Sequence, residues 1–219
     1  MKLKSFLLVV TFLVSVLCLN DFSLAQSETP EKTFWGWVKE HQDFLYNLDE
    51  TNQDQLKQFD EQLNRVNENI AFLIDSKSNN SKRVIILTSF GKTQYFPVIN
   101  KLYEQKPDLI RLDVVKYIPR GKQIGARRII GPYIDPDDVC AWIMKNKNGK
   151  VSIIFGSSQF DMNYANELMQ DLFNFTMEAI GEYDLATEIE SVDIAPNNFL
   201  SPEVVPLTKL QERLDLLFK

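Results

Sequence analysis

The sequence predicts an α+β fold in which several helices pack against a mainly antiparallel sheet. Short apolar runs of strand length alternate with longer stretches whose apolar residues recur every three or four positions. The pair Asn148-Gly149 stands between two of the apolar runs and is typical of a hairpin turn. Two β-α-β units within this order are compatible with a ferredoxin-like core, to which N-terminal helices are added. We expect a single domain over residues 33–219, after a flexible leader over residues 26–32.

The first 25 residues have the pattern of a secretory signal peptide. Lys2 and Lys4 precede an apolar run over residues 6–19, and a small-x-small cleavage site ends at Ala25. We therefore expect a secreted or periplasmic protein that is cleaved after Ala25 and has no transmembrane span in its mature chain.

The composition argues against several classes of function. The chain has 24 Lys and Arg against 30 Asp and Glu, and this acidic balance argues against nucleic-acid binding. Cys18 lies in the signal peptide, so Cys140 has no internal disulfide partner and is expected to be a small buried hydrophobe. His41 is the only histidine, which removes most zinc chemistry and every catalytic triad built on histidine. We predict no catalytic residue, no cofactor and no metal site.

The first helix is expected to begin at Thr33, which can cap it, and to carry Trp35 and Trp37. Trp35 and Val38 stand at helical spacing, so the aromatic side chains can anchor this helix on the body of the domain. The alternative is that the two tryptophans cradle a sugar or a peptide. A second amphipathic helix is expected over residues 52–69, where apolar residues step by three and four.

Two strands, over residues 70–76 and 83–89, should follow and pair as a hairpin. The uninterrupted apolar run over residues 84–87 indicates that the second of them is central in its sheet. A turn at residues 90–92 leads into a helix, and the next strand covers residues 112–118.

A basic loop follows that strand. Four positive charges lie within residues 120–128 of an otherwise acidic chain. Arg120, Arg127 and Arg128 could bind a carboxylate or a phosphate, together with backbone N–H groups of the loop. The alternative is a solvated hairpin loop whose charges pair with the acids of the same domain. The segment matches neither a Walker loop nor a dinucleotide-binding motif.

Further short strands are expected beyond the basic loop. Residues 129–133 form one, and residues 139–144 and 151–155 form a hairpin pair. The acidic residues 135–138 between them lack the order of a calcium loop and are interpreted as a turn.

The longest helix is expected to begin near Asp161 and to end at Gly181, because glycine adopts a positive φ at little cost. Its apolar residues form two neighbouring stripes, which predicts a helix at the centre of the fold, enclosed on nearly all sides. A short strand should then run to Pro196. A loop over residues 197–206 and a leucine-striped helix over residues 207–217 complete the chain.

Glu182, Tyr183 and Asp184 are expected to form a tight acidic turn after the longest helix. The favoured interpretation is that these carboxylates are solvated or hold a neighbouring loop. The alternative is that Glu182 and Asp184 form an acid/base pair.

Four motifs resemble those of an uncharacterised bacterial domain family of unknown function. They are Phe34-Trp35-Gly36-Trp37, Phe96-Pro97-Val98-Ile99, Ile118-Pro119-Arg120 and Gly181-Glu182-Tyr183-Asp184. The resemblance covers nearly all of the mature chain and implies no activity.

The sequence therefore predicts a non-catalytic binding or interaction module, whose partner is another protein or a small anionic ligand. We expect its surface between the basic loop and the acidic turn, with the helix that carries Trp35 and Trp37 as a third wall. The alternative function is a hydrolase or transferase that uses Glu182 and Asp184 as acid and base.

Overall fold

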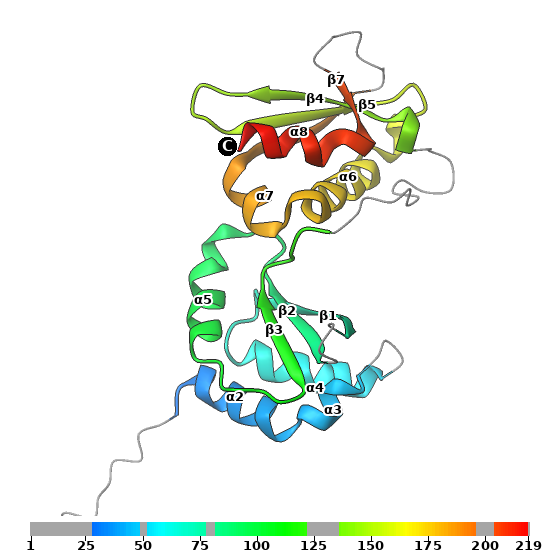
Figure 1. The fold of residues 1–219 in the computed structure, drawn as a ribbon. Coiled ribbons are helices and arrows are strands. Elements are labelled where there is room, and N and C mark those ends of the chain that lie inside the picture. The colour runs from blue at the N-terminus through cyan, green and yellow to red at the C-terminus, as the bar shows by residue number, and fades with distance from the viewer. Residues whose placement is uncertain (1–27, 49–51, 78–81, 122–135, 196–203, 219) are drawn as a thin grey trace, which may run out of the picture.

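The computed structural model describes residues 28–48, 52–77, 82–121, 136–195 and 204–218. The fold is α+β, as predicted, but the described strands form two mixed sheets rather than one mainly antiparallel sheet. Figure 1 shows the two sheets in separate lobes, one above the other, each with its own helices. We call the described residues up to Pro119 the N-terminal lobe and those from residue 136 the C-terminal lobe. The expectation of a single domain remains a prediction, because it concerns folding as one unit.

The N-terminal sheet has the order β1-β2-β3. Its strands are β1 (Ala71–Lys77), β2 (Arg83–Thr88) and β3 (Leu112–Lys116). β1 runs antiparallel to β2, and β2 runs parallel to β3, so β2 is central as its apolar run predicts. A parallel pair requires a crossover connection, and α5 (Phe96–Glu104) supplies it between β2 and β3.

Three more helices belong to this lobe: α2 (Pro30–Glu40), α3 (Gln42–Tyr46) and α4 (Gln53–Asn64). The expected start of the first helix at Thr33 is wrong. Thr29 is the N-cap, and its hydroxyl accepts a hydrogen bond from the Lys32 amide at 3.4 Å. Proline suits the first helical position, where no N–H is needed, so the helix begins at Pro30. The end of the expected leader is therefore helical.

The C-terminal sheet has the order β6-β5-β4-β7. Its strands are β4 (Cys140–Lys145), β5 (Val151–Gly156), β6 (Ile189–Ala195) and β7 (Val204–Pro206). β4 and β5 form the hairpin predicted from Asn148-Gly149, with Gly149 at φ 87°. β7 lies where a loop was expected, because Val204 and Val205 pair with β4. A strand of three residues is too short for a period to be visible in the sequence.

Helices α6 (Ala165–Ile180), α7 (Glu182–Glu188) and α8 (Leu210–Leu217) complete the C-terminal lobe. In Figure 1, α6 and α8 cover the same face of the C-terminal sheet. α6 is not enclosed on nearly all sides, as the apolar stripes predicted. One flank is exposed along its length, and its polar residues recur at helical spacing: Asn166, Glu167, Gln170, Asn174 and Glu178. α6 is therefore an amphipathic helix with one wide buried face.

Each lobe has its own hydrophobic core. Phe34, Leu63 and Ile99 are among the fully buried residues of the N-terminal core, and Phe155 and Leu172 among those of the C-terminal core. Within the described ranges, no helix is long and apolar enough to cross a bilayer. The expected signal peptide, the strand at 129–133 and most of the basic loop lie outside the described residues.

Candidate functional site

The carboxylate of Glu182 lies fully buried where the two lobes meet. Its Oε1 accepts hydrogen bonds from the amides of Ser89 (3.0 Å) and Gly91 (2.9 Å), with the Ser89 hydroxyl at 3.4 Å. Its Oε2 accepts from the Thr88 hydroxyl (2.7 Å) and the Ile118 amide (3.0 Å). A buried carboxylate is costly unless its lone pairs are satisfied. Here five donors from the N-terminal lobe satisfy a side chain of the C-terminal lobe, and we call these donors the Glu182 nest.

The nest stands at the carboxyl ends of two parallel strands. Thr88 is the last residue of β2, and Ile118 lies two residues beyond β3. Parallel strands bring their carboxyl ends to one edge of a sheet, which is where open α/β sheets bind ligands. Two non-glycine residues beside the donors have a positive φ: Phe90 at 52° and Tyr117 at 65°. Such backbone is strained and persists where the surroundings impose it, so the donors are held in place by the fold of this lobe.

Gly181 allows the chain to pass close to the N-terminal lobe. Its φ of 87° and ψ of 154° lie in a region that is essentially restricted to glycine, rather than in the left-handed helical region. A Cβ at this position would lie 3.3 Å from the carbonyl oxygen of Ile118. The Glu182 amide donates to that same carbonyl at 2.8 Å. The chain therefore reverses and starts α7 at once, and the expected acidic turn is the first turn of a helix.

Arg120 makes a second set of contacts at the junction. Its Nε donates to the carbonyl of Ile180 at 3.1 Å, and its two terminal nitrogens contact Asp215 (2.5 Å) and Asp184 (3.0 Å). Burial acts to lower the pKa of Arg120, but the hydrogen bonds to Asp215 and Asp184 outweigh it and the pKa is raised. The guanidinium is therefore a fixed cation that ties the end of α6 to α7 and α8.

Tyr183 follows Glu182 with a ring that is half exposed (52%) and packs on two aromatic rings of the N-terminal lobe. Its centroid lies 5.8 Å from that of Phe96, in a stacked arrangement, and 5.6 Å from that of Tyr117. Burial raises the pKa of Tyr117, with smaller contributions from the charges of Tyr183 and Glu182. The Tyr117 hydroxyl therefore stays neutral, and it donates to Asn100 Oδ1 at 3.0 Å.

The structure brings four of the predicted site residues together and separates two others from them. Arg120, Glu182, Tyr183 and Asp184 meet at the junction. Trp35 and Trp37 lie on α2, which Figure 1 shows at the far end of the N-terminal lobe. Trp35 is buried and donates through Nε1 to the carbonyl of Leu102 at 2.7 Å, whereas Trp37 is half-buried and stacks on His41. Trp35 is thus a docking anchor, which was the favoured interpretation.

Arg127 and Arg128 lie outside the described residues, so their role in binding remains a prediction. Glu182 and Asp184 do not share a pocket, because one is enclosed by the nest and the other faces Arg120. This geometry gives no support to the alternative of an acid/base pair. Among the described residues, no grouping of His, Cys, Asp and Glu could hold a metal ion. The half-buried Cys140 thiol donates to the carbonyl of Gly156 at 3.2 Å.

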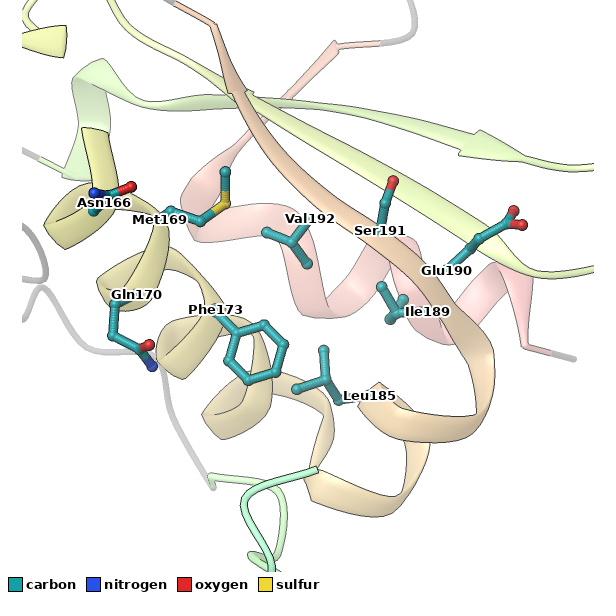
Figure 2. Close-up of a pocket in the computed structure, with 9 residues that line it drawn as sticks. All are labelled: Asn166, Met169, Gln170, Phe173, Leu185, Ile189, Glu190, Ser191 and Val192. Atoms are coloured by element: carbon teal, nitrogen blue, oxygen red, sulfur yellow. The ribbon is translucent and has the colours of Figure 1, made fainter. Parts of the chain in front are cut away.

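A groove of about 460 Å³ opens between α6 and β6. Figure 2 shows side chains from α6, α7 and β6 around it, with Phe173 and Leu185 pointing into the space between helix and strand. Five of the lining residues are apolar: Met169, Phe173, Leu185, Ile189 and Val192. Four polar residues form the remainder: Asn166, Gln170, Glu190 and Ser191. An apolar floor with a few polar groups is the usual composition of a ligand site.

The sequence indicates neither the donors of the nest nor the groove. It predicts a strand and a turn at Thr88, Ser89 and Gly91, since backbone N–H donors leave no residue signature. It predicts an enclosed helix at Met169 and Phe173. The alternation of these residues with exposed Asn166 and Gln170 was the signal that one flank of α6 is open.

No family model, curated protein or solved structure matches this chain. The resemblance to an uncharacterised bacterial family therefore remains a prediction.

Proposed function

We propose that this protein is a non-catalytic binding module, secreted or periplasmic, that binds an extended basic peptide segment of a partner protein in the groove between α6 and β6. The observation that supports this most directly is the apolar floor of the groove within an acidic part of the chain. The compartment is inferred from the signal-peptide pattern of residues 1–25.

The segments that line the groove carry charge of one sign. Residues 151–208 contain neither Lys nor Arg, and they include α6, α7 and β6. Glu190 and Asp193 on β6 are exposed, and Glu167 is exposed on α6. Electrostatic complementarity favours a partner with positive charge and speeds its association. A basic segment therefore fits this face better than an acidic one.

The strand beside the groove favours an extended ligand. Among the described strands, β6 is an edge strand of the C-terminal sheet. A peptide can add to a sheet edge through its main chain, while alternate side chains enter adjoining pockets. Val192 of β6 and Phe173 of α6 face each other across the groove in Figure 2, so an apolar side chain of such a peptide would contact both.

The test uses a fluorescein-labelled peptide of alternating lysine and valine, followed by fluorescence anisotropy. We expect saturable binding that weakens as salt is added. A peptide of lysine and serine should bind more weakly because it lacks apolar side chains, and a peptide of glutamate and valine should not bind. Equal binding of the lysine–valine and lysine–serine peptides would show that binding depends on charge alone and that the apolar groove does not contribute. That result would refute the proposal.

Two variants locate the site. Phe173→Ser removes an apolar contact and should weaken binding about tenfold or more, since burying such a side chain contributes about 1.5–3 kcal/mol. Glu190→Lys reverses a charge at the rim and should also weaken binding. The control is Glu61→Lys on α4, which makes the same charge change at an exposed position of the other lobe. The proposal fails if Glu61→Lys weakens binding as much as Glu190→Lys does.

A further inference from the structure

The Glu182 nest is a binding site formed by one lobe and filled by the other. All five donors belong to the N-terminal lobe, and the glutamate that they bind lies between 64 and 94 residues further along the chain. The relation between nest and glutamate is therefore that of a receptor and a ligand that happen to share a chain.

The nest is organised by contacts that do not involve Glu182. The Thr88 hydroxyl accepts from the Phe90 amide at 2.9 Å, and the Ser89 hydroxyl donates its one hydrogen to the carbonyl of Lys92 at 3.1 Å, sharing it with Glu182. The Tyr117 amide donates to the carbonyl of Leu87 at 2.7 Å, which fixes the backbone just before Ile118. Because these bonds lie within the N-terminal lobe, the donors should remain aimed at the same point when the glutamate is absent.

The arrangement of donors selects a carboxylate. One oxygen receives the amides of Ser89 and Gly91, and the other receives the Thr88 hydroxyl and the Ile118 amide. Two sets of donors on two oxygens match a planar carboxylate, and hydrogen bonds to an ionised acceptor are among the strong ones. The donors themselves are neutral backbone and hydroxyl groups, so recognition rests on hydrogen bonds rather than on a cation.

We propose that the nest is a carboxylate-binding site in its own right, with Glu182 as its tethered ligand and small monocarboxylates as ligands that can replace it. Glu182→Ala removes one methylene and the carboxylate, which together have the size of acetate. Acetate should therefore occupy the vacated nest and restore the hydrogen bonds. The wild-type protein should not respond, because a tethered group has a high effective concentration.

The experiment follows amide hydrogen exchange of Ser89, Gly91 and Ile118, together with the melting temperature. In Glu182→Ala these amides should exchange faster than in the wild type. Acetate at about ten times its Kd should slow their exchange about tenfold, since ligand binding reduces the open population by that factor. The melting temperature should rise saturably with acetate. Sodium chloride at the same concentration should have no comparable effect.

Two controls separate a carboxylate site from a general salt or filling effect. Acetamide has the shape of acetate without its charge and should not slow exchange in Glu182→Ala. The wild-type protein keeps the nest filled with Glu182, so acetate should not act on it. The inference is overturned if acetate acts no more strongly than acetamide or sodium chloride, or if the wild type responds as Glu182→Ala does. Should Glu182→Ala not fold alone, refolding from urea in acetate and in acetamide decides: recovery in acetate only supports the site, and equal failure in both overturns it.

Discussion

The contribution of the Glu182 nest to stability can be measured by changing one of its donors, Thr88, to valine. Thr88 is fully buried, and its hydroxyl donates to the Glu182 carboxylate at 2.7 Å while it accepts from the Phe90 amide at 2.9 Å. A hydrogen bond to a charged group contributes about 1.5–3 kcal/mol, and an amide left unpaired costs about 1 kcal/mol or more. Thr88→Val should therefore lower the free energy of unfolding by about 3 kcal/mol.

Thr176 provides the matched control. It is also fully buried, and its hydroxyl donates at 2.7 Å to the carbonyl of Leu172, four residues earlier in α6. That carbonyl already accepts a backbone N–H within the helix, so loss of the hydroxyl leaves no polar group unpaired. Thr176→Val should cost less than about 1 kcal/mol. The two variants make the same chemical change at the same degree of burial.

Urea unfolding at 25 °C, followed by tryptophan fluorescence and by circular dichroism, gives both free energies. For a chain of this size, 3 kcal/mol corresponds to a fall in melting temperature of about 6–12 °C. If Thr88→Val and Thr176→Val differ by less than about 0.5 kcal/mol, the nest does not stabilise the fold as argued. Loss of the N-terminal transition alone would show that the lobes unfold separately.

Four further predictions concern backbone conformation and buried charge. Gly181→Ala should cost about 1–3 kcal/mol, because its φ and ψ are restricted to glycine. Gly36→Ala in α2 should instead stabilise by up to about 1 kcal/mol in the same urea titration, since a Cβ there meets nothing within 4 Å. The hydrogen bond from Lys101 lowers the pKa of Glu31. Its contribution to the free energy of unfolding is therefore complete above about pH 4.5 and is lost as the pH falls through the lowered pKa. Urea titrations across this range should show a smaller acid loss in Lys101→Met than in the wild type. Burial raises the pKa of Asp171, so Asp171→Asn should be more stable than the wild type at pH 7 and should lose this advantage below about pH 3.8; a neutral effect at pH 7 would contradict it.

The sequence located most elements because their signals are local. The apolar run over residues 84–87 marked a central strand, and Asn148-Gly149 marked a hairpin, each from a few neighbouring residues. The division into two sheets was not predictable in this way. It depends on which strands pair, and β3 joins β2 whereas β4 joins β5 and the distant β7. The apolar pattern within one strand does not determine which other strand it pairs with.

In the candidate site, too, the sequence indicates some residues but not their partners. Arg120, Glu182 and Asp184 could be selected from sequence because their side chains are charged and stand beside turns. What they bind could not be selected, because the partners of Glu182 are mainly backbone amides placed by the fold of another lobe. The amphipathic period of α6 did carry information about the groove, but the wide apolar face concealed the exposed flank.

The short helix α7 links the Glu182 nest to the groove, because a helix this short depends on its contacts with both. A helix of seven residues is not stable on its own, so its position depends on the groups that it contacts. Glu182 at its start is bound by the N-terminal lobe, and Ala186 packs against the core of that lobe. Leu185, between them, belongs to the C-terminal core and lines the groove. Because Leu185 lies in the same turn of helix as Glu182, we expect a change that releases the carboxylate from the nest to shift Leu185 and with it one wall of the groove.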